Sequence, residues 1–421
     1  MSNQRGFVCM MSLFVVVFLA GWSAMLFQRS ITEFNATNRS AQLQQAFHLA
    51  EGGLDDARQW LSSQPSPPSG IDPIDPFNGP QAIAGGSYSV TIDPDDANPT
   101  NYVDLFTITV TGQMAGGAIS RQLIEMVHAE SFSRYSYFTN REKMSDGTRI
   151  WFSSGHHLWG PVQSNDQFNI SGSPIFESLI TSAASSIFYR NPPPTGGNHP
   201  QFNGGVALNA GTVTLPLSSA RLRVAASSGG AWYTGNTTIT LQADGTMLVT
   251  NTVKGWINKL LSLPANGAIF VNGGNVKVSG TMHGQLTIGT SNDLVILNNV
   301  TYANDPQIHP ESTDILGLVA EKNVVISQSA PNDLSIQASV MALQSSFTVE
   351  NWWVGPPKGT LSVYGGIIQD RRGPVGSINA STSTRFSGYA KSYRYDTRFS
   401  SIAPPSFPTT GNYDEILWQE Q

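Results

Sequence analysis

GAIFVNGGNVKVSGTMHGQLTIGTSNDLVILNNV, the sequence of residues 267–300, decides the fold of most of this chain. Apolar residues recur there in pairs at i and i+2, for example Ile269 with Val271 and Val276 with Val278. Such alternation is typical of short strands that bury one face. Asn and Gly separate the pairs, and both residue types favour tight turns. The stretch therefore predicts several short strands rather than helices.

Similar apolar pairs continue as far as residue 369. Pairs that begin at 269, 294, 316, 340 and 361 follow one another at steps of 25, 22, 24 and 21 residues. A parallel β-helix needs several short strands in each such circuit, because a circuit excludes water only when it is stacked on its neighbours. We therefore predict a β-rich, parallel β-helix-like domain over residues 131–421, with inserted loops and a hairpin at Thr237–Asn251. A β-sandwich is the alternative.

Toward the N-terminus, residues 7–27 form an uncharged apolar run, FVCMMSLFVVVFLAGWSAMLF. A run of this length suffices to cross a bilayer as a helix. No proline follows between Arg29 and Leu61, and the prolines from Pro65 onward then end the helical pattern. We predict one transmembrane and stalk helix over residues 7–62. A cleaved secretory signal peptide is the alternative, and the continuity of the helical pattern argues against it.

An apolar stripe follows the second half of this helix at spacings of 3 and 4, and we predict that it is the helix assembly face: Leu43, Phe47, Ala50, Leu54, Ala57 and Leu61. Alternating residues in 87–93, 105–112 and 119–127 predict three strands. These strands indicate a small β-meander within residues 63–130. We expect the meander to lie at the end of the helix and to cover its apolar stripe.

The composition excludes several classes of function. The 421 residues carry a net charge of -6 with only 23 Lys and Arg, so we expect no nucleic-acid partner. The single cysteine, Cys9, permits no intramolecular disulfide and no cysteine-based metal cluster. His156 and His157 could hold a metal with Asp166, but we favour a turn in which one imidazole packs on Trp159. We expect no metal and no cofactor.

Catalytic motifs are also missing from the sequence. The acidic residues between Asp293 and Asp370 are dispersed, whereas glycoside hydrolysis needs converging carboxylates, so we predict that the protein is not an enzyme. Trp352 and Trp353 are the most suggestive ligand or partner contacts, although they could equally cap the stacked core. The loop 93–104 spaces three aspartates as a calcium loop does but lacks its glycine, which favours a solvated acidic loop.

The N-terminal residues resemble a known family. Arg5–Gly6–Phe7 before the apolar run is similar to a type IV prepilin leader, which implies a leader of residues 1–6 and cleavage between Gly6 and Phe7. AFHLAEGGL, residues 46–54, resembles the signature of PilX-type minor pilin-like proteins. Major pilins carry Glu at the fifth position after the cut, where this chain has Met11. The resemblance therefore implies a minor or initiating subunit.

The resemblance also sets the expected location and partners. It implies a type IV pilus or a type II secretion pseudopilus, with other pilins or pseudopilins, a prepilin peptidase and inner-membrane lipid as partners. The chain would cross the inner (cytoplasmic) membrane once and display its C-terminal domain in the periplasm or outside the cell. GYAKSYRYD, residues 388–396, is similar to a C-terminal domain of unknown function in some prepilin-like proteins. The alternative is a membrane-anchored surface β-helix protein that binds or modifies carbohydrate.

Overall fold

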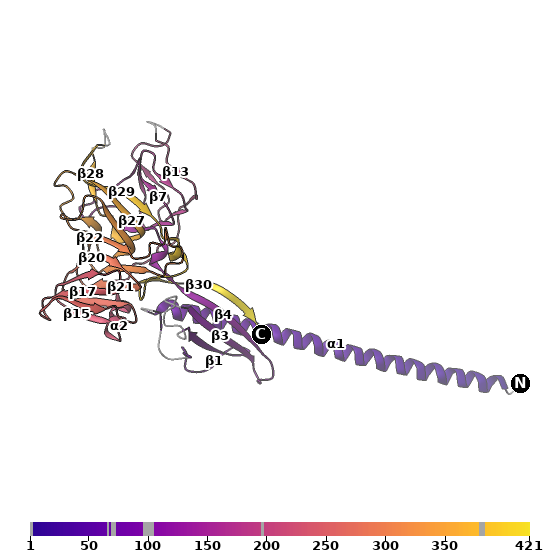
Figure 1. Cartoon of the computed structure of the whole chain (residues 1–421). Coiled ribbons are helices and arrows are strands. Elements are labelled where there is room, and N and C mark those ends of the chain that lie inside the picture. Colours follow the sequence, from indigo (N-terminus) through magenta and orange to yellow (C-terminus); the bar gives the residue numbers. More distant parts are fainter. Residues whose placement is uncertain (1–2, 65–66, 69–72, 96–104, 195–197, 379–383) are drawn as a thin grey trace.

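The protein is mainly β with one long N-terminal helix, as predicted. The computed structural model describes residues 3–64, 67–68, 73–95, 105–194, 198–378 and 384–421. Helix α1 (Asn3–Ser63) is continuous over 61 residues, which corresponds to about 90 Å at 1.5 Å per residue. Figure 1 shows it extending far beyond the rest of the molecule. The apolar run and the striped segment therefore form a single rod.

An antiparallel sheet packs on the last third of α1. Its strands follow the order β1 (Gln81–Ile83), β2 (Gly86–Pro94), β3 (Leu105–Met114), β4 (Ser120–Ser131) and β30 (Thr409–Glu420). Alternate residues of β2 and β3, among them Ile92 and Ile108, are fully buried together with Ala50 and Leu54 of the helix. The predicted meander is present and covers the apolar stripe.

Strand β30 corrects the predicted extent of the β-helix-like domain. The sequence pattern predicts one unit over residues 131–421, but β30 pairs antiparallel with β4, for example Tyr413 with Ala129. A strand that pairs with a partner nearly 300 residues earlier leaves no local sequence signal. The β-rich domain is therefore an insertion between β4 and β30, and both of its ends return to the sheet on α1 (Figure 1).

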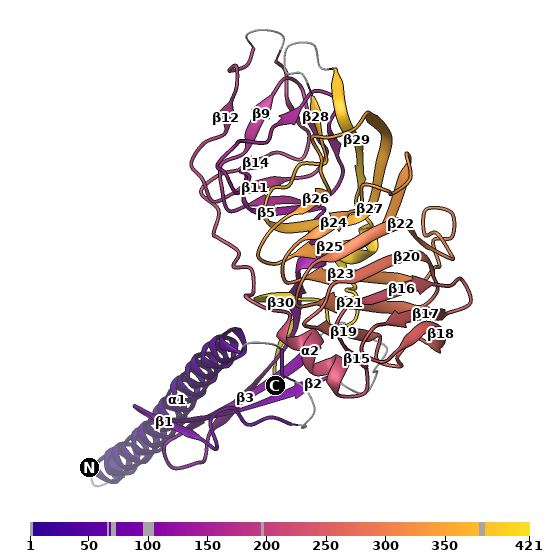
Figure 2. The ribbon, with the colours of Figure 1, turned by 90° about the vertical axis from the view of Figure 1, so that its left-hand side faces the viewer.

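The inserted domain is a stack of parallel strands, which is the arrangement of a parallel β-helix. One row of paired strands runs β15–β19–β21–β23–β25–β27–β5–β8–β11–β14, and every pair in it is parallel. Figure 2 shows this stack from β15 at one end, past β23 and β25, to β11 and β14. The β-sandwich alternative is excluded, because a sandwich consists of antiparallel sheets.

The domain contains two segments of strands. The first segment comprises η1 (Phe132–Arg134), β5 (Tyr137–Arg141), β6 (Phe152–Ser153), β7 (His157–Leu158), β8 (Val162–Ser164), β9 (Asn169–Ser171), β10 (Ile175–Phe176), β11 (Ile180–Ser182), β12 (Phe188–Tyr189), β13 (Gln201–Phe202) and β14 (Val206–Ala207). Helix α2 (Ala220–Ser227) follows.

The second segment comprises β15 (Ala231–Thr234), β16 (Thr237–Leu241), β17 (Thr246–Asn251), β18 (Trp256–Ser262), β19 (Ala268–Asn272), β20 (Val276–Met282), β21 (Gln285–Thr290), β22 (Leu294–Tyr302), β23 (Ile315–Ala320), β24 (Val324–Ile326), β25 (Leu334–Ala342), β26 (Phe347–Val349), β27 (Pro357–Arg371), β28 (Gly376–Ile378), β29 (Arg385–Arg394) and η3 (Thr397–Ser400). Strands β16 and β17 form the predicted hairpin.

The chain enters the stack in its middle. From β5 the chain continues strand by strand to β14 at one end of the stack. It then crosses through α2 to β15 at the other end and continues back toward the middle, where β27 lies beside β5. There Ile367 pairs with Tyr137 and Gln369 with Thr139, so residues about 230 positions apart become neighbours. The first strand of the insertion, β5, and the late strand β27 therefore form a junction at the centre of the stack.

The predicted circuit length is wrong, although the apolar pairs that we predicted to face inward are buried in the core. Ile269 pairs with Ile288, Ile288 with Leu318, and Leu318 with Val340, at steps of 19, 30 and 22 residues. Leu294 pairs with Val324 and not with Leu316, because it belongs to a different row of strands. The loops between strands differ in length, so a constant step does not identify neighbouring circuits.

The outer face of the main row is buried as well as its inner face. Phe138, Phe270 and Met341 point away from the interior of the stack and form a second apolar cluster. Leu222 of α2 and Phe407, in the segment that leads to β30, cover this cluster. The crossing segment and the returning chain are therefore held against the stack by hydrophobic burial.

Candidate functional site

The N-terminal part of α1 is apolar and is exposed over its described residues. Among the described residues, α1 is a helix long and apolar enough to cross a membrane. Phe7, Phe14 and Phe27 are 61%, 71% and 70% exposed. An exposed ion pair between Arg29 and Glu33 marks the end of this apolar surface. Such a surface is typical of a single-pass membrane anchor, since it would otherwise face water.

The structure corrects the assignment of the predicted assembly face. Ala50, Leu54, Ala57 and Leu61 are buried against the sheet of the same chain, with Phe47 partly buried beside them. Only Leu43, at the start of the stripe, lies outside this cluster. The spacing identified a buried helix face correctly but could not tell an intramolecular partner from another subunit. The surface of α1 that remains open to other molecules is its first half, which includes Gly6, Phe7 and Met11.

Polar contacts fix the orientation of α1 on its sheet. Arg58 donates to Glu125, whose carboxylate is fully buried on the inner face of β4. Tyr88 of β2 donates to Asp56, and burial together with this carboxylate raises the pKa of Tyr88 to about 12. Gly53 lies directly against Tyr88 and Val110, where a Cβ atom would approach within 2.6 Å of the tyrosine ring. The helix therefore sits on the sheet in one defined position.

A polar groove of about 560 Å³ crosses one face of the stack at the junction. Its floor consists of β25, β27, β29 and β7, and outward-facing residues of these strands line up in register. Ser335 pairs with Ser362 and Ser362 with Ser392. Tyr393 pairs with Leu158, which places His157 next to Ser392 in the same row.

A second row of side chains runs parallel to the serine row, two residues further along each strand. Gln337 pairs with Tyr364, and Tyr364 pairs with Arg394. The register of β29 with β7 places Trp159 beside Arg394, and the Arg394 guanidinium lies 5.7 Å from the centre of the Trp159 ring. His157 stacks on the same ring at 4.2 Å. The groove therefore combines hydroxyls, amides, one guanidinium and an aromatic platform.

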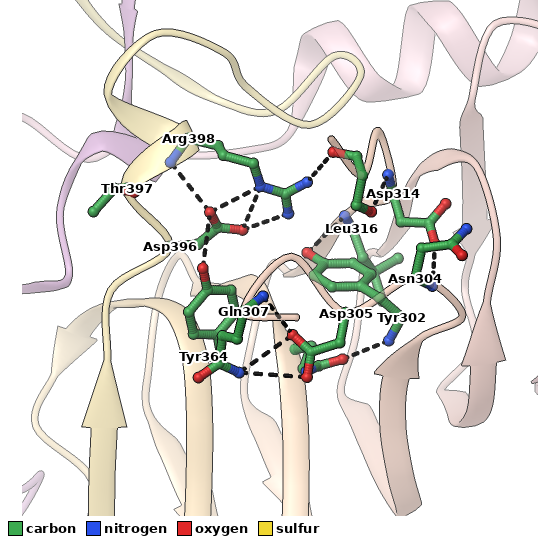
Figure 3. Close-up of polar contacts among 12 residues, drawn as sticks. Tyr302, Asn304, Asp305, Gln307, Asp314, Leu316, Tyr364, Asp396, Thr397 and Arg398 are labelled. Carbon is green, nitrogen blue, oxygen red and sulfur yellow. Dashed lines mark hydrogen bonds and ion pairs between the residues drawn. The ribbon is translucent and has the colours of Figure 1, made fainter. Parts of the chain in front are cut away.

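The loop between β22 and β23 forms the rim of the groove beside Gln337. Gln337 donates to Asp305 at 2.8 Å and accepts from the Tyr302 backbone at 2.6 Å. Asp305 also accepts from the side chain and the backbone of Gln307, as Figure 3 shows. Gln307 in turn accepts from Arg394 at 3.3 Å. This loop is therefore tied to two strands of the groove floor.

Behind this rim lies a buried ion pair. Arg398 donates to the fully buried carboxylate of Asp396 through Nε and Nη2, at 3.0 and 2.6 Å (Figure 3). The Tyr364 hydroxyl is directed at the same carboxylate at 3.5 Å. Burial and the Asp396 charge raise the pKa of Tyr364 to about 12, so this hydroxyl stays protonated at neutral pH. These contacts fix Tyr364, and hence one wall of the groove.

Charged groups also lie beneath the groove, inside the junction. Arg372 and Glu142 form a buried ion pair at 2.7 Å, and both side chains are about 1% exposed or less. Lys391 faces this interior, and burial, together with the charge of Arg372, lowers its pKa to about 7. Burial likewise lowers the pKa of His156 well below its usual value. The junction is therefore a polar layer within an otherwise apolar core.

The two predicted tryptophan contacts differ in environment. Trp352 packs against the main core, whereas Trp353 is 61% exposed. Their ring centres are 5.5 Å apart, and Trp352 lines a cavity of about 160 Å³ outside the groove. Trp352 therefore packs on the stacked core, whereas Trp353 is exposed, and a ligand or partner contact of this pair stays a prediction.

The predicted metal candidates do not converge. Asp166 accepts from the Glu142 backbone at 3.0 Å, while His157 bonds Glu177 at 2.5 Å. His157 is also the imidazole that packs on Trp159, as we expected for one of the two histidines. Over the described parts of the chain, no three His, Cys, Asp or Glu side chains are grouped as metal ligands. Most of the acidic loop 93–104 lies outside the described residues.

Sequence reasoning did not identify the groove. Its residues come from 157–159, 335–337, 362–364 and 392–394, and only the stacking of β7 on β29 and of β29 on β27 brings them together. The repeated pattern of Ser followed two residues later by a larger polar or aromatic residue, as in Ser335–Gln337, Ser362–Tyr364 and Ser392–Arg394, was a usable signal. It was hidden among the many other serines of the turns.

One segment of the chain matches a family model, and most of the chain is similar to a solved structure. Residues 101–185 match a family described as "Domain of unknown function (DUF4900)". No curated protein matches the sequence. Among solved structures, the competence-associated pilin ComZ from Thermus thermophilus is similar over 90% of this chain and 98% of that chain, with 12% identity and a TM-score of 0.35.

Proposed function

We propose that this protein is a membrane-anchored, pilin-like structural protein, a minor or accessory subunit of a type IV pilus or a type II secretion pseudopilus. The observation that carries the proposal is the division of α1 into an uncovered apolar half and a half that is buried on the chain's own sheet. The leader-like residues Arg5–Gly6–Phe7 and the AFHLAEGGL segment support it by their resemblance to PilX-type pilins.

The proposed mechanism is assembly and display, in which no bond is made or broken after processing. A prepilin peptidase would cut between Gly6 and Phe7 in the inner membrane. The apolar half of α1 would then move from lipid into contact with the helices of other pilins, because both surroundings exclude water from Phe14 and its neighbours. The inserted domain would be carried on the periplasmic or extracellular side.

Met11 favours a minor or initiating subunit over the major subunit that repeats along a filament. It occupies the position at which major pilins carry a glutamate, and it is itself exposed. A methionine cannot pair with the N-terminal amine of a neighbouring subunit. A single copy at the start of a filament would need that ion pair less than each copy of a repeating subunit would.

Two measurements test the proposal. First, we expect a prepilin peptidase to release residues 1–6 and leave Phe7 as the new N-terminus, whereas a Gly6→Leu variant stays uncut. Second, a photo-crosslinking residue at Phe14 should form adducts with other pilins in cells that assemble them. The same residue at Leu54, which is 4% exposed, should form none. A mature chain that begins beyond Ala24, or the absence of adducts from position 14, would refute the assignment.

A further inference from the structure

We infer that the groove formed by β25, β27, β29 and β7 binds a linear polysaccharide whose sugar units carry carboxylate groups. Binding at this groove is independent of the proposed anchoring and display, since those depend on α1 and would hold whatever the groove binds.

The repeat of the groove fits a polymer. Neighbouring strands of a sheet lie about 4.8 Å apart, so the four strands present equivalent positions over about 14 Å. The spacing of about 4.8 Å between neighbouring strands is close to the length of one pyranose unit in an extended chain. Ser335, Ser362 and Ser392 repeat at this interval in register, and the groove crosses the strands along the same direction. A chain of sugars laid across the strands would meet the same group at each unit.

The serine hydroxyls are available for a ligand. Over the described residues, the side-chain hydroxyls of Ser335, Ser362 and Ser392 make no hydrogen bond, although most polar side chains around them are paired. A hydroxyl can both donate and accept, as can the hydroxyls of a sugar. The row therefore offers hydroxyls that have no hydrogen-bond partner within the described chain, on a rigid scaffold of paired strands.

Trp159 supplies an apolar platform at one end of the rows. It is 40% exposed, which is unusual for a ring of this size that is already stacked on one side by His157. The His157 ring is held in turn by Glu177 at 2.5 Å, and Glu177 also accepts from Asn203 at 2.7 Å. The exposed part of a ring braced in this way can contact the apolar surface of a sugar at little entropic cost.

The charge of the groove indicates an anionic sugar. Arg394 is exposed at the surface, and its described polar partner is the uncharged Gln307. The nearby carboxylates are already occupied: Asp305 by Gln337, and Asp396 by Arg398. Among the described residues that line the groove there is no carboxylate, although the chain as a whole has a net charge of -6. A guanidinium in this setting is suited to bind a carboxylate through paired hydrogen bonds.

A nucleic acid fits the same groove less well. Its backbone carries one phosphate per nucleotide and needs a comparable density of Lys and Arg, whereas the rows offer Arg394 alone beside the partly buried Lys391. The strands of the floor instead contribute mainly neutral hydrogen-bonding groups, and the Lys and Arg side chains among the described lining residues are Lys391 and Arg394. That ratio suits a sugar polymer with many hydroxyls and few charges.

The test is isothermal titration of the full chain in detergent micelles with defined oligomers. The uronate probes are oligogalacturonate, oligomannuronate and hyaluronan oligomers. The matched neutral probe is methyl-esterified oligogalacturonate, and the anionic control without sugar carboxylates is oligothymidylate. We expect at least one uronate to bind. Its neutral or esterified form should bind at least about tenfold more weakly, and oligothymidylate should bind more weakly still.

Variants assign the binding to the groove. Trp159→Ala should weaken uronate binding by about tenfold or more, and Arg394→Gln by about ten- to a hundredfold. Arg190→Gln and Trp353→Ala, at exposed positions outside the groove, should leave it unchanged. Unchanged circular dichroism and melting would show that the Arg394 and Trp159 variants fold. Failure of all uronates to bind, equal binding of the ester, preference for oligothymidylate, or binding insensitive to both groove variants would overturn the inference.

Discussion

The buried ion pair between Arg372 and Glu142 gives the sharpest prediction about stability. Arg372 Nη1 lies 2.7 Å from Glu142 Oε2, and the guanidinium also donates to the carbonyls of Ile150 and Trp151. The pair connects the chain just after β5 with the chain just after β27, two strands that meet at the junction. We predict that Arg372→Met, which keeps a side chain against Phe152 but removes the charge, will loosen this junction.

The expected magnitude follows from burial. Glu142 is fully buried, so the variant leaves a carboxylate without its counter-ion, and breaking such a pair typically costs about 3–5 kcal/mol of folding free energy. The guanidinium also lies 3.6 Å from the centre of the Phe152 ring, and this cation–π contact is lost too. Removing both charges, as in Arg372→Met with Glu142→Leu, should recover most of the loss, because no unpaired charge then remains.

Urea unfolding of the full chain in detergent, followed by tryptophan fluorescence, measures the effect. The neighbouring residue provides the control: Arg371 pairs with Asp370 at 3.5 Å, and its side chain is 32% exposed. Arg371→Met should cost under about 1 kcal/mol, since exposed ion pairs contribute little. The reasoning fails if Arg372→Met costs no more than Arg371→Met, or if the double variant is as unstable as Arg372→Met alone.

Three further predictions concern packing and protonation. Gly53→Ala should destabilise the chain, because the new Cβ would lie 2.6–2.7 Å from Tyr88 and Val110. Gly52→Ala meets nothing within 4 Å and should stabilise α1 by up to about 1 kcal/mol. Thermal unfolding of the two variants, measured side by side, tests both expectations. Leu222→Ala should cost about 2–5 kcal/mol, because Leu222 is fully buried under the stack, while Val224→Ala, at a position 64% exposed, should cost little in the same denaturation assay. Lys391 should make the free energy of unfolding rise with pH from about 7 toward 10. The folded chain loses the Lys391 proton near pH 7, while the unfolded chain keeps it up to about 10.5, so unfolding takes up a proton in this window. The free energy of unfolding should therefore rise by up to about 1.4 kcal/mol per pH unit. Lys391→Met should abolish that slope in denaturation curves taken at pH 7, 8 and 9, and an unchanged slope would contradict the assigned pKa.

The local pattern of residues was sufficient to predict the elements of this fold. The unbroken run from Phe7 to Leu61 specified one helix, because nothing in it stops the hydrogen-bonding ladder of the backbone. Alternation at Ser87–Asp93 and at the pairs from Ile269 onward specified strands and their buried faces, since side chains alternate across a strand with a period of two. The Asp244–Gly245 turn likewise specified its hairpin.

Only the tertiary structure decided which elements meet. The pairing of β30 with β4, the meeting of β27 with β5, and the burial of Ala50 and Leu54 on the chain's own sheet all join segments that are distant in the sequence. An apolar stripe records that a face is buried but not what buries it. The groove arises for the same reason: Ser335, Ser362, Ser392 and Trp159 each occupy an ordinary outward-facing strand position, and stacking alone aligns them into one surface.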